Sequence, residues 1–171
     1  MFKVNELVVY GLNGVCKIVD IKKLQLISNR GPSGDYYYLN PISSKEDHLI
    51  YVPVDKVNNE NGVMRALSKP GELEDILNSV NEVQPLEIVN EKYRREEYKA
   101  ALLTLSPKNS VALIKSVRNR KKRLQQRKNI SETDLEFEKL ALKFLCLEMS
   151  VVLGISTQEA EYRILDSIDF E

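Results

Sequence analysis

The sequence predicts an α+β fold, in which a small β-barrel is followed by an all-α bundle of about five helices. Two observations along the 171 residues support this division. The first sixty-odd residues are rich in β-branched and aromatic side chains broken by turn signals, which is typical of short strands. From Ser68 onward the apolar residues recur with a period near 3.6, which is typical of helices. We therefore expect two domains, residues 1–66 and residues 67–171.

Four or five short strands are predicted in the first domain, with the clearest at residues 7–10, 15–23, 35–40 and 49–54. The turn Gly11-Leu12-Asn13-Gly14 and the Gly-, Pro- and Ser-containing loop 29–34 separate them. So few strands cannot form two stacked sheets, and curling into an SH3-like or Tudor-like barrel limits the exposed edges. The polar stretch Asn58–Gly62 predicts a domain boundary between residues 58 and 68.

Five helices are predicted in the second domain, at about 70–80, 90–105, 107–127, 132–153 and 157–168. Serines precede four of them as expected N-caps, and Gly154 is placed where a helix end favours a left-handed residue. These serines are Ser68, Ser106, Ser131 and Ser156. Apolar residues cover a wide face of the fourth helix, which should therefore form the buried centre of the bundle. The residues expected on that face are Leu135, Leu142, Leu145, Met149 and Val152, widened by Leu140, Phe144, Leu147 and Val151.

The side chains give little support for catalysis. His48 is the single histidine, and the sequence contains none of the phosphate-binding, dinucleotide-binding or hydrolase motifs. Cys16 and Cys146 are far apart in apolar surroundings, which favours two buried thiols over a metal site. No apolar run approaches the length of a membrane span. We therefore expect a cytoplasmic protein that is not an enzyme, with no cofactor, metal, membrane partner or small-molecule substrate.

The charges are balanced overall but segregated along the chain. The sequence has 25 basic and 25 acidic residues. Residues 1–91 carry a net charge of −4, residues 92–128 a net charge of +11, and residues 129–171 a net charge of −7. A neutral protein with one strongly basic segment is a candidate for binding a polyanion.

The basic segment contains two clusters. The run from Lys115 to Lys128 has no acidic residue, and at helical spacing its cations form two rows. These rows are Lys115, Arg118 and Lys122, and Arg120, Arg123 and Arg127, with Lys121 and Lys128 beside them. The second cluster mixes cations with aromatic rings, as DNA-binding surfaces do: Lys92, Tyr93, Arg94, Arg95, Tyr98 and Lys99. Two alternatives remain open: the acidic segment 129–171 neutralises the run within the bundle, and the tyrosines, Tyr98 above all, pack in the core.

Several motifs in order along the chain resemble the CarD/CdnL transcription regulators of bacteria, whose N-terminal module is shared with transcription-repair coupling factor. Residues 2–10 with Gly14-Val15 are similar to the family's opening F-x-V-G-D-x-V-V-Y-x-x-x-G. Tyr37-Tyr38-Leu39 and residues 49–54 resemble its Y-x-x-L and V-P strands. Arg95 through Leu105 resemble R-R-Y-K-x-x-L-x-x-L, and Val117-Arg118 with residues 128–131 resemble V-R-x-L…K-x-L-S.

The resemblance implies a Tudor-like domain that binds the β subunit of RNA polymerase and a helical domain that contacts promoter DNA near the −10 region. The positions that match the polymerase-facing strands are Lys22, Lys23, Tyr51, Val52 and Pro53. The family commonly inserts a tryptophan into the minor groove, whereas this sequence has no tryptophan. Depending on the alignment, Tyr93 or Arg94 takes that position. The expected DNA-binding residues are Tyr93, Arg94, Arg95, Lys99, Arg118, Lys121 and Lys122.

The function that follows from the resemblance is a non-enzymatic transcription regulator, associated with the nucleoid through RNA polymerase, that stabilises the open promoter complex. Stabilising the melted state needs only tighter binding to that state. One alternative is a protein-interaction module without direct DNA binding. Another is a Tudor-type reader of modified side chains, which would need an aromatic cage. Strand alternation should split the adjacent Tyr36, Tyr37 and Tyr38 between two faces.

Overall fold

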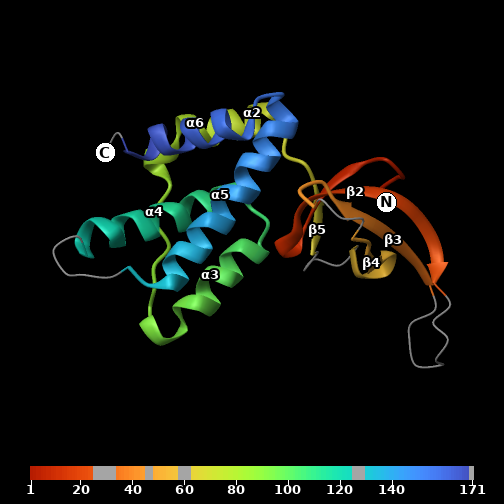
Figure 1. Cartoon of the computed structure of the whole chain (residues 1–171), viewed down its shortest axis with the longest axis horizontal. Helices are drawn as coiled ribbons and strands as arrows, with labels where there is room; N and C mark the ends of the chain where they lie inside the picture. The colour runs from red at the N-terminus through yellow and green to blue at the C-terminus, as the bar shows by residue number, and fades with distance from the viewer. Residues whose placement is uncertain (25–33, 45–47, 58–62, 125–129, 170–171) are drawn as a thin grey trace. The chain divides into compact units, whose positions relative to one another are not determined.

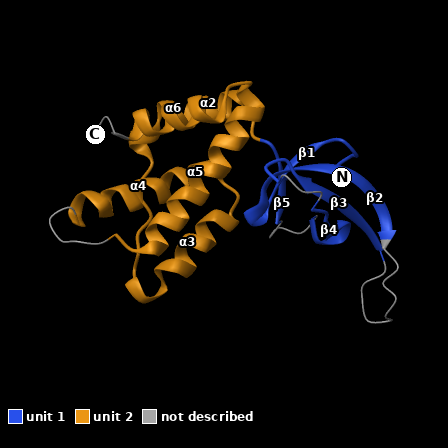
Figure 2. Ribbon diagram, viewed as in Figure 1, with its two compact units in different colours: residues 1–67 blue, residues 68–171 orange. Residues whose placement is uncertain are grey.

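The computed structural model describes residues 1–24, 34–44, 48–57, 63–124 and 130–169. The chain forms two compact units, residues 1–67 and residues 68–171 (Figure 2). Strands occupy the first unit and the five longer helices the second, so the predicted α+β class is confirmed (Figure 1). Of the features predicted from sequence, residues 29–33, the stretch Asn58–Gly62, and Arg127 and Lys128 lie outside the described residues.

The first unit is a five-stranded antiparallel sheet with the strand order β4-β3-β2-β1-β5. Its strands are β1 (Leu7–Tyr10), β2 (Gly14–Leu24), β3 (Gly34–Pro41), β4 (Ile50–Pro53) and β5 (Met64–Ala66). The turn η1 (Gly11–Asn13) joins β1 to β2. Its first residue, Gly11, and the residue that follows it, Gly14, have φ angles of 45° and 70°, a region that glycine enters without strain. Predicted strand 49–54 ends early because Val54 begins the short helix α1 (Val54–Val57).

The core of this sheet comes from alternate residues of four strands and from β5. Its buried residues are Val8, Cys16, Ile18, Tyr37, Leu39, Val52 and Met64. The pairing of β2 with β3 shifts between Ile18 and Asp20, so the strand alternation changes face at this bulge.

The second unit contains α2 (Pro70–Asn78), α3 (Arg94–Leu103), α4 (Pro107–Leu124), α5 (Glu132–Leu153) and α6 (Thr157–Asp169). Two short 3-10 turns, η2 (Val80–Glu82) and η3 (Glu91–Tyr93), lie between α2 and α3. Helix α5 contacts α2, α3, α4 and α6, which confirms its predicted central position (Figure 1). Among the described residues, no single helix is long and apolar enough to cross a membrane, and α5 and α6 satisfy that test only as a pair bent by 115°.

The predicted buried face of α5 is partly wrong. Leu135 is 48% exposed, whereas Phe137, Ala141, Leu145 and Met149 are buried. Three carboxylates also lie on the buried side of α5, and the apolar pattern does not reveal them. These residues are Asp134, Glu138 and Glu148.

Three of the four predicted serine caps are confirmed. The Oγ atoms of Ser106, Ser131 and Ser156 accept backbone N–H bonds from the residues three positions later, and Gly154 ends α5 with a φ of 67°. Ser68 does not cap α2. Its N–H donates to the Glu148 carboxylate at 2.8 Å, and the Glu72 carboxylate accepts the N–H of the true cap residue, Lys69, at 2.9 Å.

Candidate functional site

The predicted polymerase-facing residues lie on β2 and β4, the two strands that flank β3 in the sheet. Cross-strand pairing aligns Asp20, Tyr38 and Tyr51 in one row and Lys22, Tyr36 and Pro53 in the next. Tyr38 and Tyr51 meet edge to face with ring centroids 4.8 Å apart, and Lys22 forms an ion pair with Asp20. Tyr51 is half exposed and lies on the edge strand β4. We call these six residues the sheet patch.

Two predicted residues do not share the sheet patch. Val52 points to the opposite face and is only 2% exposed within the core of the sheet. Its strand neighbours Tyr51 and Pro53 point the other way because side chains alternate along a strand. Lys23 is exposed but follows Lys22 by one residue and pairs with Asp35, outside the two rows. Sequence reasoning omitted Asp20, Tyr36 and Tyr38 from the polymerase-facing set, because the pairing register between strands places them beside Lys22, Tyr51 and Pro53.

The two tyrosines of the aromatic basic cluster have different surroundings. Tyr93, at the end of η3, is 50% exposed, and the Lys92 ammonium lies 5.6 Å from its ring centroid. Tyr98 is fully buried beside Phe137, and its hydroxyl donates to Asp134 at 3.1 Å. Burial and the nearby Asp134 carboxylate raise the pKa of Tyr98 to about 12. Tyr98 is therefore a core residue, and Tyr93 presents its ring to solvent.

Asp134 of α5 forms ion pairs with one arginine of α3 and one arginine of α4. Its carboxylate is 1% exposed and lies 3.2 Å from the Nε atom of Arg94 and 3.3 Å from that of Arg120. The two arginines also share the carboxylate of Glu91. These hydrogen bonds, led by those from Arg120, lower the pKa of Glu91, and the Glu91 carboxylate raises the pKa of Arg120.

Other acidic residues of α5 pair with further cations of the predicted DNA-binding set. Glu138 lies 3.3 Å from the Nε atom of Arg118 and also pairs with Lys121. Glu136 accepts two hydrogen bonds from Arg95, at 2.7 and 2.9 Å. Acidic residues of the segment 129–171 thus pair with Arg118, Arg120 and Lys121 of the basic run. This pairing agrees with the alternative in which the acidic segment neutralises the run within the bundle.

Lys115 is buried, although the helical spacing placed it in a row of surface cations. It is 3% exposed, and its ammonium donates to the carbonyl oxygen of Val80 at 3.1 Å. By contrast, Lys99, Lys122 and Arg123 are exposed. Within the described part of the chain, no carboxylate forms an ion pair with any of these three side chains. The cations available to an external anion are therefore fewer than the sequence predicts.

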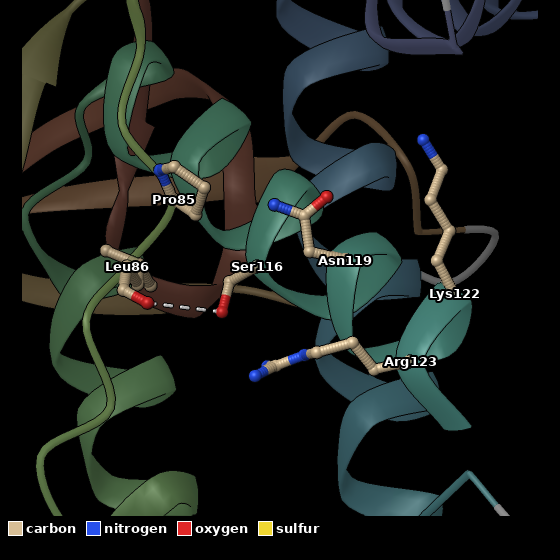
Figure 3. A pocket seen from close by; sticks show the side chains of 6 residues that line it. All are labelled: Pro85, Leu86, Ser116, Asn119, Lys122 and Arg123. Carbon is tan, nitrogen blue, oxygen red and sulfur yellow. Dashed lines mark hydrogen bonds between the residues drawn. The ribbon is translucent and has the colours of Figure 1, made fainter. Parts of the chain in front are cut away.

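A shallow groove of about 490 Å³ lies beside two of these available cations (Figure 3). Pro85 and Leu86 form one side, and α4 forms the other through Ser116, Asn119, Lys122 and Arg123. The Ser116 hydroxyl donates to the Leu86 carbonyl oxygen at 3.3 Å. In Figure 3, Asn119 and Arg123 extend from α4 toward Pro85 and Leu86, whereas Lys122 points away.

The described residues contain no group of three or more His, Cys, Asp or Glu side chains arranged to hold a metal ion. Both cysteines are buried and unpaired with each other. The features that stand out are thus two surfaces, one aromatic patch on the sheet and one aromatic and cationic region around η3 and α4.

Comparison with known families bears on the first surface. The sequence model of the CarD-like/TRCF RID domain matches residues 2–68. The N-terminal unit is therefore similar to a CarD-like/TRCF RID domain. The resemblance noted in the sequence is confirmed over these residues, and with it the Tudor-like character of the strand unit. An RID domain is a protein-interaction domain that points to contact with RNA polymerase in transcription.

The sheet patch lies entirely inside the RID domain, because its residues fall between positions 20 and 53. The helical unit lies beyond the matched residues. No curated protein matched the chain.

Proposed function

We propose that the protein is a non-enzymatic transcription regulator that binds the β subunit of RNA polymerase through its RID domain and promoter DNA through its helical unit. The match of residues 2–68 to the RID domain carries this proposal. The DNA contact lies near the −10 region and stabilises the open complex. It is supported by the half-exposed ring of Tyr93 next to the cations of η3 and α3.

The sheet patch is the proposed polymerase-binding surface. Lys22, Tyr51 and Pro53 contact the partner there, Lys23 contributes from the strand end, and Val52 supports β4 from inside the core. Exposed aromatic rings such as that of Tyr51 are enriched at the centres of protein interfaces, and charged groups such as Lys22 and Asp20 are more common at the polar rim.

Capture of purified RNA polymerase by the full chain tests this surface. Lys22→Glu and Tyr51→Ala should each weaken capture about tenfold or more, since an interface anchor contributes at least about 1.4 kcal/mol. Lys17→Glu is the matched control, because Lys17 is exposed on the same strand outside the patch. Equal loss in the control, or full capture by both patch variants, would contradict the assignment.

We assign the DNA surface to Tyr93, Lys99, Lys122 and Arg123, and we leave out Arg95 because Glu136 binds its guanidinium group. Arg118 and Lys121 instead hold α4 against α5 through Glu138. Each phosphate contact lowers the slope of log affinity against log salt by about 0.9. Lys122→Gln should therefore flatten that slope by about one unit, whereas Lys121→Gln, its paired neighbour, should change it less.

The pairing of Arg118 and Lys121 with Glu138 favours a second candidate function, a protein-interaction module without direct DNA binding. Fluorescence anisotropy with duplex promoter DNA at 50–200 mM salt, a range over which phosphate contacts weaken strongly, separates the two. Polymerase capture with no measurable DNA affinity would support this candidate and overturn the DNA contact.

A further inference from the structure

The guanidinium groups of Arg94 and Arg120 lie side by side, and the buried carboxylate of Asp134 holds both. Arg94 begins α3, and Arg120 lies in the last two turns of α4. The Nε atoms of both face the buried Asp134 carboxylate, at 3.2 and 3.3 Å. The Nη2 atom of Arg94 also donates to the Ser131 hydroxyl at 2.8 Å. Only 14% of the Arg94 side chain and 21% of the Arg120 side chain remain exposed.

The outer edges of the same two groups converge on one carboxylate. Arg120 donates from Nη1 and Nη2 to the two oxygens of Glu91, both at 2.6 Å. Arg94 donates from Nη1 to one of these oxygens. Glu91 is 59% exposed, far more than either arginine or Asp134. An exposed side chain of the short turn η3 thus covers a rigid pair of cations.

The charges make this carboxylate replaceable. Asp134 supplies one negative charge to two guanidinium groups, so the pair keeps a charge of +1 when Glu91 is absent. Guanidinium forks bind phosphate oxygens in the same bidentate geometry as carboxylate oxygens. A phosphate group brings the negative charge and the acceptor oxygens that Glu91 gives up, so the exchange leaves neither arginine without a partner.

We propose that Arg94 and Arg120 form a phosphate-binding site that Glu91 occupies in the unbound protein. A phosphate oxygen displaces the Glu91 carboxylate and accepts the same Nη donors. As a contact with the DNA backbone the site rests on the proposed function, and it lies beside the exposed Tyr93, two residues after Glu91. Free inorganic phosphate has the same chemistry and is the alternative source.

The decisive variant is Glu91→Gln, which keeps the shape of the side chain and removes its charge. Glu87→Gln is the matched control, because Glu87 is exposed four residues earlier and forms no ion pair within the described residues. Glu91→Gln combined with Arg120→Gln removes one half of the site. Thermal unfolding of each variant first establishes that it is folded.

Inorganic phosphate is the first probe. It should raise the melting temperature of the Glu91→Gln variant above the value in sodium chloride of equal ionic strength. The wild type, the Glu87→Gln control and the double variant should show little rise, because Glu91 competes in the first two and the pair is broken in the third. No phosphate effect on folded Glu91→Gln protein, or an equal effect on Glu87→Gln, would overturn the site.

Duplex DNA is the second probe. One added phosphate contact makes the ratio of affinities at 50 and 200 mM salt about three- to fourfold larger. That gain should appear with Glu91→Gln and disappear in the double variant. If Glu91→Gln protein binds inorganic phosphate but no variant binds DNA, the site stands with free phosphate as its source, and the DNA part of the proposed function fails.

Discussion

Tyr93 and Tyr98 lie five residues apart and have opposite roles in the structure. Tyr98 shares a helix face with Leu102, and both are buried. Tyr93 precedes α3 and presents its ring to solvent at 50% exposure. A substitution at either position therefore tests a different property, binding at Tyr93 and stability at Tyr98.

Tyr93→Ala should shorten the lifetime of the open promoter complex. Loss of an aromatic stack on a base costs about 1–3 kcal/mol, which corresponds to roughly a five- to hundredfold shorter lifetime. The melting temperature should hardly change, because the ring is half exposed. Competitor-challenged lifetimes on promoter DNA measure the first quantity, and thermal unfolding measures the second.

Two further substitutions serve as comparisons for Tyr93→Ala. Tyr93→Trp should preserve or lengthen the lifetime, since the larger ring stacks at least as well. Tyr98→Ala should destabilise the fold by about 3–5 kcal/mol, as truncation of a buried aromatic ring does. A stable Tyr93→Ala protein with a full lifetime would remove the ring from the DNA contact and leave Arg94 as the alternative.

For single residues, the sequence pattern predicted which cations lie on α4, but it did not predict which of them are available to an external anion. Arg118 and Lys121 belong to the basic run, yet their partner Glu138 lies 20 and 17 residues away on another helix. Helical spacing also placed Lys115 on the surface, whereas the packing of η2 against α4 buries it under the Val80 carbonyl oxygen. Pairing across helices depends on tertiary packing, which local spacing does not encode.

At the scale of the helices and strands, the local signals were sufficient for most boundaries. The start of α5 after Ser131 and its end before Gly154 agree with the prediction, because a hydroxyl cap and a left-handed residue act within one turn. Strand β5 was missed because it is three residues long and is defined only by pairing with β1. The N-cap of α2 is Lys69 and not Ser68, because the helix begins at Pro70, and the Ser68 N–H group instead donates to Glu148, 80 residues away.

The N-cap of α5 should matter more than the N-cap of α6. Ser131 accepts from the Asp134 N–H group and from Arg94, and it donates to the Asp134 carboxylate at 2.9 Å. Ser131→Ala removes all three bonds and should lower the free energy of unfolding by about 2 kcal/mol, the upper end for a cap. Urea denaturation monitored by circular dichroism measures this loss.

Ser156→Ala is the matched control for that experiment. Ser156 caps α6 by accepting the Glu159 N–H bond at 3.0 Å. Its removal should cost about 1 kcal/mol, the typical value for a simple cap. Equal losses in the two variants would show that the Ser131 contacts to Arg94 and to the Asp134 carboxylate add nothing to stability.

The whole molecule has equal numbers of basic and acidic residues, but it contains two separate cores, and its charges are unevenly distributed. Each unit has its own cluster of buried apolar residues. In the helical unit, the acidic side of α5 neutralises Arg94, Arg95, Arg118, Arg120 and Lys121. The net charge of a sequence segment therefore overestimates the charge that the folded surface presents to DNA.

Each of the two units carries one of the two cysteines, Cys16 in the sheet and Cys146 in α5. Burial raises the pKa of each thiol from 9.0 to about 12. The thiolate is the reactive form, so at pH 8 each folded site holds about a thousandfold less of it than the unfolded chain. The stability linked to the neutral thiols is present below pH 9 and declines as the pH rises toward 12.

Alkylation by iodoacetamide can therefore report the opening of each unit without any engineered label. We expect both thiols to react at pH 8 at least about a hundredfold more slowly than in urea-unfolded protein, as followed by mass spectrometry of the labelled peptides. Rapid labelling of Cys146 in the native chain would contradict its burial in α5. Different urea dependences at the two cysteines would reveal separate unfolding of the sheet and the helices, and a common dependence would reveal one cooperative transition.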